Sequence, residues 1–171
     1  MIDKLSLVIF KRLLFQTMLT IIQRVTQAQV VVNNITIGKI DQGILALVAI
    51  EKEDSEKEAK RLLERILNYR IFADENDKMN LSLLAIKGGL LVVPQFTLAA
   101  NTQSGNRPSF STAATPEKGL ALFDFFCEQA TKVYPATEFG QFGADMKVSL
   151  TNDGPVTFTL KTTYPNAIKL S

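Results

Sequence analysis

Hydrophobic and polar residues follow two recurring patterns along the chain, and the first predicts β-strands. Near the start, β-branched and other apolar residues fall into three runs, at residues 19–33, 35–40 and 44–50. The third run is almost continuously apolar, which is typical of a strand buried on both faces. Asn33-Asn34 is a turn candidate between the first two runs. Three consecutive strands with short connections predict an antiparallel sheet.

The second pattern places an apolar residue at every third or fourth position and predicts two amphipathic helices. Residues 55–69 begin with Ser55 and Glu58 at the spacing of a capping box, and a regular apolar stripe follows. Thr115 and Pro116 supply an N-terminal cap and a first-position proline for the second helix. The apolar stripe of this helix, expected to face the core, consists of Leu122, Phe123, Phe126, Ala130 and Val133.

A central strand and its polar end mark the candidate site. Residues 90–93 are apolar and partly β-branched, and Gly88-Gly89 precedes them, which predicts a short buried strand. The chain turns polar at Gln95 and Thr97, and polar groups held by a rigid strand end are a common way to build a binding site.

Near the C-terminus, Gly154-Pro155 separates two more runs with a strand pattern, residues 146–150 and 156–161. We expect these two strands to end the fold and this dipeptide to converge with Gln95 and Thr97 on one site. The combined pattern predicts an α+β fold in which antiparallel sheets close toward a barrel and two main helices pack outside.

A length of 171 residues fits one domain, which we place at residues 18–163. The apolar part of residues 1–17 is too short for a signal peptide and far short of the ~20 residues of a membrane span. We expect either an extension that precedes a start at Met18, or an amphipathic helix on the core or on a partner. Residues 164–171 are expected to form a loose tail.

The composition excludes several kinds of chemistry. The chain has no His and a single Cys, Cys127. Catalytic triads that use His, zinc sites with His ligands and disulfide frameworks are therefore excluded, and we predict neither a metal nor a cofactor. Cys127 lies in the second predicted helix and is expected to be a packed residue. A lone Cys fits the reducing cytoplasm, where we place the protein with no membrane partner. Residues 74–77 are expected to form an acidic surface loop.

Several motifs carry a resemblance to a known family. The three longest are Gln95-Phe96-Thr97-Leu98, Arg107-Pro108-Ser109-Phe110 and Asn152-Asp153-Gly154-Pro155-Val156-Thr157. Shorter matches stand at Gln23-Arg24-Val25, Arg70-Ile71-Phe72, Lys78-Met79-Asn80-Leu81 and Phe142-Gly143-Ala144-Asp145-Met146. In this order, covering residues 18–161, they resemble the D-aminoacyl-tRNA deacylase family. One position departs from the family pattern, because Pro94 stands where Ser is usual.

The resemblance implies an enzyme that hydrolyses the ester between a D-amino acid and the 3′-terminal adenosine of tRNA, and also glycyl-tRNA mischarged on alanine tRNA. Such an ester is already activated, so an enzyme must hold it and stabilise the developing oxyanion rather than own a strong base. A His-free chain is compatible with this reaction. We assign it to Gln95, Phe96 and Thr97, with assistance from the ribose 2′-hydroxyl. Thr97 as a nucleophile is the alternative, but that role requires an adjacent base.

The same resemblance implies a cis Gly154-Pro155 bond that one subunit of a homodimer inserts into the site of the other. Main-chain oxygens at this dipeptide would collide with an L side chain and leave a D side chain free, which excludes L-amino acids. Arg24 matches the family's Arg and is expected to hydrogen-bond these carbonyls, and Phe142 to pack against the inserted segment. On the residues alone, an ordinary Gly-Pro turn remains the alternative.

Two other functions remain open. One is a non-catalytic nucleic-acid-binding protein on the same fold, although a net charge of +2 and the lack of a basic, aromatic stripe argue against it. The other is a generic esterase. Two residue roles are also open: Arg107 either meets a phosphate or is a plain exposed side chain, and Phe96 either positions the substrate or belongs to the core.

Overall fold

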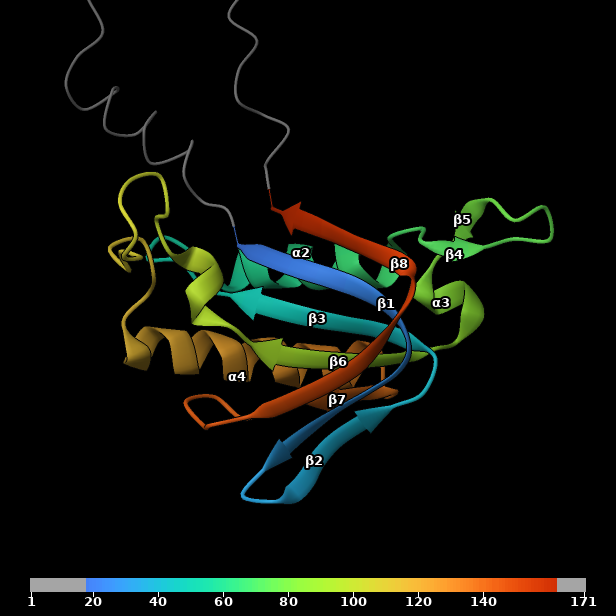
Figure 1. The fold of residues 1–171 in the computed structure, drawn as a ribbon, viewed down its shortest axis with the longest axis horizontal. Helices are drawn as coiled ribbons and strands as arrows, with labels where there is room; N and C mark the ends of the chain where they lie inside the picture. The colour runs from blue at the N-terminus through green and yellow to red at the C-terminus, as the bar shows by residue number, and fades with distance from the viewer. Residues whose placement is uncertain (1–17, 163–171) are drawn as a thin grey trace, which may run out of the picture.

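The computed structural model describes residues 18–162, so the extension predicted for residues 1–17 and the tail predicted for residues 164–171 lie outside the described residues. Within the described part, six strands form one sheet (Figure 1). Five are hydrogen-bonded in the order β2-β1-β3-β6-β7, and β8 pairs with β1 off this path. The bounds of the strands are β1 Leu19–Val32, β2 Ile35–Ile40, β3 Gly43–Ala49, β6 Gly89–Pro94, β7 Thr137–Phe139 and β8 Lys147–Lys161.

The predicted α+β class is confirmed, and the sheet is mixed rather than purely antiparallel. Strand β1 pairs antiparallel with β2, β3 and β8, as predicted for the first three strands. Strands β3, β6 and β7 instead run parallel. The reason lies in the connections: helix α2 (Glu56–Asn68) lies between β3 and β6, and helix α4 (Pro116–Val133) between β6 and β7. Parallel neighbours require such long crossovers.

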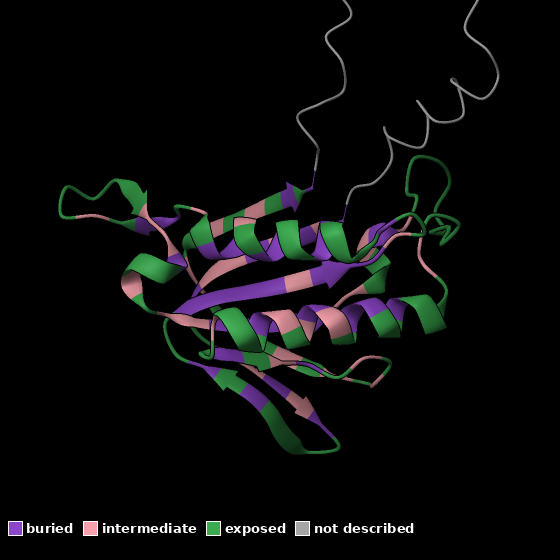
Figure 2. Ribbon diagram, turned by 180° about the vertical axis from the view of Figure 1, so that it is seen from behind, coloured by how far each residue is buried: buried purple, intermediate pink, exposed green. Residues whose placement is uncertain are grey.

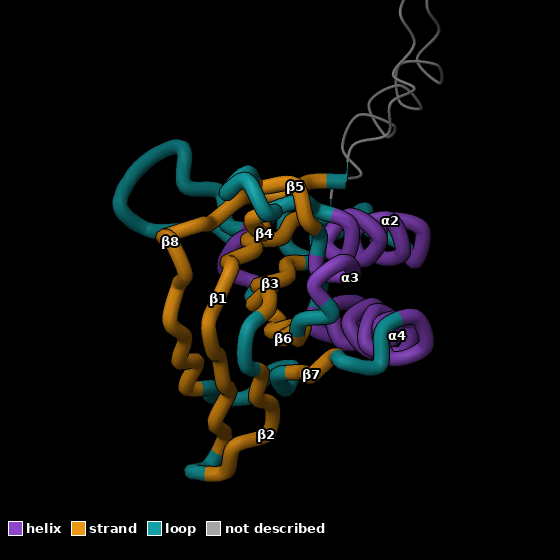
Figure 3. Tube along the Cα trace, turned by 90° about the vertical axis from the view of Figure 1, so that its right-hand side faces the viewer, coloured by secondary structure: helices purple, strands orange, loops and turns teal. Residues whose placement is uncertain are grey.

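Both predicted helices form and cover one face of the sheet (Figure 3). The capping box of α2 is present, with the main-chain N–H of Ser55 donating to Glu58 Oε2 at 2.9 Å. Thr115 caps α4 through its side chain. Buried residues alternate with exposed ones along each helix (Figure 2), and of the stripe predicted for α4 only Val133 is wrong, because it is 58% exposed in the last turn. The core between helices and sheet includes Ile44, Leu62, Ile66, Leu90, Val92 and Phe126.

The sheet curls so that its other face encloses a second, smaller core. This core contains Val25, Val30, Leu45, Leu91 and Val93. Strand β2 closes over it: a Cβ on Gly38 would lie 2.9 Å from the main-chain oxygen of Phe139 on β7, so a glycine permits this approach. Strand β6 is therefore buried on both faces, which confirms the buried strand predicted for residues 90–93, and the sheet forms the expected barrel-like shape.

The prediction of two separate C-terminal strands was wrong. Residues 147–161 form the single strand β8, which pairs with β1 on both sides of residues 153–156. The pairing register shifts between Gln23 and Val25 and again between Val25 and Gln27. Gly154-Pro155 therefore lies within a continuous strand, at a bulged part of the β1–β8 ladder, and not between two strands.

Three smaller elements complete the fold. Strands β4 (Phe72–Ala73) and β5 (Met79–Leu81) form a hairpin, and the short helix α3 (Leu83–Ile86) follows it. Residues 74–77 form the connection of this hairpin at the surface, as predicted for the acidic loop. Across residues 18–162, the helices lack the length and apolar character that crossing a membrane would need.

Candidate functional site

The predicted site begins where β6 ends. The main-chain N–H of Gln95 donates to the carbonyl of Val48 on β3 at 2.7 Å, which fixes the strand end against its neighbour. A single turn of 3-10 helix, η1 (Phe96–Ala99), follows at once. Its first internal hydrogen bond runs from Leu98 N to the Gln95 oxygen at 3.2 Å. The N–H groups of Phe96 and Thr97 precede this bond, so the turn itself does not use them.

The side chains of Gln95 and Thr97 are joined. Gln95 Nε2 donates to Thr97 Oγ1, and this is the hydrogen bond that the structure gives to the Thr97 hydroxyl. Thr97 is exposed and Gln95 is half-buried. An amide is neither a base nor an acid at neutral pH, so the partner of Thr97 orients the hydroxyl without activating it.

A narrow pocket opens beside Gln95. It joins the end of β6 to the start of α4, and its lining consists of Val48, Ile50, Pro94, Gln95, Phe96, Ala114, Gly119 and Phe142. The structure thus brings Gln95, Phe96 and Phe142 together. Phe142 packs closely on α4, because a Cβ on Gly119 would lie 3.0 Å from Phe142 Cζ. Sequence reasoning missed Gly119, although a glycine inside a helical pattern is a signal of close approach.

Phe96 does not belong to the core. Its side chain is 58% exposed, and its ring lies against that of Phe110 with centroids 5.1 Å apart. The first alternative for Phe96, a positioning residue at the mouth of the pocket, therefore fits the geometry. Cys127 is half-buried in α4, and burial raises the pKa of its thiol to about 12, so it is a packed thiol and not a thiolate nucleophile.

The Gly154-Pro155 peptide bond is cis, and both residues are exposed. Gly154 has a φ of +131°, and a Cβ there would lie 2.9 Å from Arg24 Nη2 and 2.7 Å from Val156 Cγ2. Arg24 donates from Nε to the main-chain oxygen of Asp153 at 3.0 Å. This oxygen belongs to the residue before Gly154, so the hydrogen bond falls one position earlier than the sequence suggested.

Further contacts of Arg24 and of Asn152 hold residues 152–157 in place. Arg24 also donates from Nη1 to the carbonyl of Ile71 at 2.7 Å, and its Nε forms an ion pair with the Asp153 carboxylate at 3.1 Å. The Asn152 side chain accepts from Val156 N at 2.7 Å and donates to Thr157 Oγ1 at 2.9 Å. The dipeptide is therefore presented on a well-anchored bend. Asn152 and Ile71 were not predicted to take part.

Within one chain the two predicted stretches do not meet. Arg24 is paired with Ile44 of β3, whereas Gln95 is bonded to Val48, four residues further along the same strand. Four residues of a strand span about 13 Å. Gly154-Pro155 is also absent from the lining of the Gln95 pocket.

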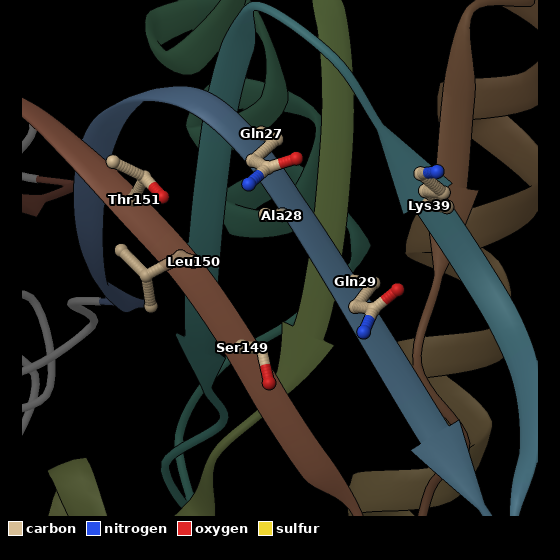
Figure 4. Close-up of a pocket in the computed structure, with 7 residues that line it drawn as sticks. All are labelled: Gln27, Ala28, Gln29, Lys39, Ser149, Leu150 and Thr151. Carbon is tan, nitrogen blue, oxygen red and sulfur yellow. The ribbon is translucent and has the colours of Figure 1, made fainter.

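A second hollow lies on the outer face of the sheet, where β8, β1 and β2 are adjacent (Figure 4). Its lining is largely polar and consists of Gln27, Ala28, Gln29, Lys39, Ser149, Leu150 and Thr151. Among residues 18–162, no group of three or more Cys, Asp or Glu side chains could hold a metal ion. We assign no chemistry to this hollow.

Comparison with known proteins decides the family. Residues 21–161 match the family described as D-Tyr-tRNA(Tyr) deacylase. The chain belongs to this family. A D-aminoacyl-tRNA deacylase of Photorhabdus laumondii is 58% identical over 84% of this chain and 99% of its own length. One from Pseudoalteromonas translucida is 59% identical over 82% of this chain and 97% of its own length.

Two solved structures share this fold. One, the c-Myc DNA Unwinding Element Binding Protein, is 38% identical, covers 85% of this chain and 99% of its own, and superposes with a TM-score of 0.81. Another, described as "a probable eukaryotic D-amino acid tRNA deacylase", covers 86% of this chain and 100% of its own at a TM-score of 0.76, and its 16% identity supports the fold alone. The resemblance to the deacylase family and the enzyme class, a hydrolase acting on aminoacyl-tRNA, are confirmed.

Proposed function

We propose that this chain hydrolyses the ester of D-aminoacyl-tRNA, and of glycyl-tRNA mischarged on alanine tRNA, to release the free amino acid and the tRNA. The observation that carries the proposal is the end of β6 in a member of the deacylase family, where Gln95 and Phe96 line one pocket and the Gln95 side chain holds the Thr97 hydroxyl. The ligand is the 3′-terminal aminoacyl-adenosine, and the reaction uses no cofactor.

Catalysis relies on the main chain and on the substrate. Water attacks the ester carbonyl, the bond from this carbon to the ribose O3′ breaks, and O3′ leaves with a proton. The unused N–H groups of Phe96 and Thr97 stabilise the negative charge that develops on the carbonyl oxygen. The ribose 2′-hydroxyl positions the water. Thr97 then acts through its hydrogen bond with Gln95 as a positioning residue, rather than as the nucleophile.

Selection against L-amino acids comes from the main chain at Gly154-Pro155 of a second subunit. Three features support a homodimer with this insertion. The dipeptide is exposed and firmly held by Arg24, it stands too far along the sheet to reach the Gln95 pocket of its own chain, and β8 around it is largely uncovered. Apolar side chains elsewhere on β2 and β8 are also exposed: Ile35, Ile37 and Leu150. In the dimer, Phe142 of the pocket would pack against the inserted segment.

A deacylation assay with matched D-tyrosyl-, L-tyrosyl- and glycyl-tRNA tests the proposal, with light scattering to give the mass in solution. We expect rapid hydrolysis of the D and glycyl esters, no acceleration for the L ester, and the mass of a dimer. Failure to hydrolyse D-tyrosyl-tRNA would refute the activity. Equal rates for the two enantiomers would refute the chiral selection, and a monomeric mass would refute the insertion across subunits.

Non-catalytic binding to nucleic acid is the second candidate, because one structural relative is named as a DNA-unwinding-element binding protein. A net charge of +2 gives this chain little attraction for long nucleic acids. Tight, salt-sensitive binding to duplex DNA by a protein that leaves D-tyrosyl-tRNA intact would favour this function. A generic esterase would instead cleave simple esters as fast as charged tRNA.

A further inference from the structure

Two exposed aromatic rings stand beside the pocket, and the proposed chemistry leaves one of them without a role. Phe96 is 58% exposed and Phe110 41% exposed, although apolar rings of this size are usually buried. Their centroids are 5.1 Å apart with the ring planes tilted by 51°. Phe96 also lines the pocket, whereas Phe110 contacts Phe96 and is not part of that lining.

The position of Phe110 is fixed by the main chain. Asn101 and Ser109 exchange two hydrogen bonds, at 2.7 and 3.1 Å, which close the loop between them directly before Phe110. The Phe110 carbonyl accepts from Ala113 N at 3.2 Å, and the Thr112 hydroxyl donates to the carbonyl of Ala99 in η1. The two rings are therefore held together on a frame tied to the catalytic turn, which favours a preformed surface over a loose loop.

The charge of this surface suits a phosphate backbone. From residue 95 to residue 115 the sequence contains one charged residue, Arg107, and no acid. Arg107 is exposed, and its guanidinium forms no ion pair with the part of the chain from 18 to 162. Exposed aromatic rings in a segment whose single charge is a cation are features by which proteins bind single-stranded nucleic acid.

We infer that Phe96 and Phe110 form a stacking platform for the nucleotide that precedes the terminal adenosine of tRNA, with Arg107 contacting its phosphate. This inference rests on the proposed function, because it places the terminal adenosine at the Gln95 pocket. The platform continues from the pocket lining through Phe96 to Phe110, so the single-stranded end of the tRNA follows it outward. Base stacking on aromatic rings does not depend on sequence, as an enzyme serving many tRNAs requires.

The test compares D-tyrosyl-tRNA with D-tyrosyl-adenosine, which lacks the preceding nucleotide. Phe110→Ala should raise KM for the tRNA at least fivefold with little change in kcat, since stacking on one aromatic ring commonly contributes this much. Its effect on D-tyrosyl-adenosine should be less than twofold. Phe110→Tyr should behave as wild type and Phe110→Leu as the alanine variant, because leucine keeps the apolar area and loses the ring.

Arg107→Gln provides a second measurement. The slope of log KM against log salt concentration for the tRNA should decrease by about 0.7, the value for one phosphate contact on a single strand. The inference would be overturned if Phe110→Ala lost equally on both substrates, or if Phe110→Leu kept full function. A change of mass in Phe110→Ala would also overturn it, because the two rings would then form a contact between protein copies.

Binding separates this inference from the proposed function. Phe110→Ala should weaken binding of the trinucleotide CCA at least fivefold relative to wild type and leave binding of adenosine unchanged, measured by titration calorimetry. If the wild-type protein fails to hydrolyse D-tyrosyl-tRNA, the proposed function fails, and this binding comparison still decides the platform: equal binding of CCA by wild type and Phe110→Ala would refute it.

Discussion

Arg24 Nε lies 3.0 Å from the main-chain oxygen of Asp153 and 3.1 Å from a carboxylate oxygen of the same residue. The Arg24 side chain is 15% exposed and the Asp153 side chain 41% exposed, so the guanidinium is largely shielded from water while the carboxylate is not. Because Asp153 precedes Gly154, a single guanidinium on β1 sets the path of the exposed dipeptide on β8. The third contact, to the carbonyl of Ile71, ties the same group to the chain after α2.

Replacing Arg24 should therefore impair the reaction more than the fold. Lysine carries a single ammonium group and cannot reproduce a planar fork that reaches both Asp153 and Ile71. We expect Arg24→Lys to lower kcat/KM for D-tyrosyl-tRNA about tenfold and Arg24→Ala somewhat more, since hydrogen bonds to charged groups contribute about 1.5–3 kcal/mol. Arg61→Ala is the matched control, because Arg61 pairs with Glu64 at an exposed surface and such pairs contribute little. Equal activity of the Arg24 and Arg61 variants would contradict the role of Arg24.

A side chain at Gly154 should also disturb the bend that Arg24 holds, because it would collide with Arg24 itself. An alanine Cβ would lie 2.9 Å from Arg24 Nη2 and 2.7 Å from Val156 Cγ2, at a φ of +131° that L residues rarely adopt. Backbone strain of this kind costs about 1–3 kcal/mol. We expect Gly154→Ala to lower the melting temperature and to reduce kcat/KM for D-tyrosyl-tRNA at least tenfold.

Gly105→Ala is the control for Gly154→Ala. Gly105 also has a positive φ, +71°, but a Cβ there would meet no atom within 4 Å. This variant carries the backbone strain without the collision with Arg24. If both alanine variants lose activity to the same extent, the loss reflects strain in general, and the contact between Gly154 and Arg24 has no specific role.

Thr97→Ala distinguishes positioning from nucleophilic attack. The Thr97 hydroxyl is held by the Gln95 amide, and loss of one such neutral hydrogen bond costs about 1 kcal/mol. We therefore expect kcat for D-tyrosyl-tRNA to fall by no more than about tenfold, in single-turnover assays. Trapping of an acyl-enzyme on the wild-type protein by acid quench and mass spectrometry, with its loss in Thr97→Ala, would instead establish Thr97 as the nucleophile.

Local signals predicted most of the secondary structure. The Ser55–Glu58 capping box and the Thr115-Pro116 start located both helices, because caps act within a few residues of sequence. The parallel pairing of β3 with β6 could not be predicted, since it depends on where the α2 crossover returns the chain. For the candidate site, motifs predicted Gln95, Phe96 and Thr97, which lie together at the end of β6. The hydrogen bond from Arg24 to Asp153 depends on the bulge where β1 pairs with β8, and these strands are far apart in the sequence, so no local pattern predicts it.

Pro94 should prove compatible with activity, even though the family usually has Ser there. Along β6, the N–H groups of alternate residues face β7, and Pro94 falls in that set. Strand β7 pairs only with Leu90, Leu91 and Val92, so the N–H that proline lacks has no partner strand at this position. We expect Pro94→Ser to leave kcat/KM within about threefold and to lower the free energy of unfolding by about 0.4–1 kcal/mol through the unfolded chain. A large gain of activity in Pro94→Ser would show that the serine hydroxyl takes part in the reaction.

Ionisation of Asp54 should lower the free energy of unfolding as the pH rises from about 4 to 7. Its carboxyl is 1% exposed, and this burial raises its pKa from 3.8 to about 7. Nearby Glu51 and Glu58 raise it as well, whereas Lys118 and a hydrogen bond from Glu51 N at 2.7 Å oppose them. Between these two pKa values the folded protein binds a proton that the unfolded chain has lost, so the stabilisation is complete below pH 4 and lost above pH 7.

Urea unfolding at pH 5 and pH 8 measures this effect. Asp54→Asn cannot ionise, and its side-chain oxygen can still accept from Glu51 N, so the variant should lose less stability than wild type between the two pH values. Asp74 supplies the opposite control, because hydrogen bonds from Asn80 and from main-chain N–H groups lower the pKa of its exposed carboxyl. The contribution of Asp74 to the free energy of unfolding is complete above the pKa that its carboxyl has in the unfolded chain, and it declines only as the pH falls below that value. Asp74→Asn should therefore leave the difference in the free energy of unfolding between pH 5 and pH 8 nearly unchanged. A wild-type protein equally stable at both pH values would mean that the Asp54 carboxyl is ionised in the fold, with Lys118 outweighing its burial.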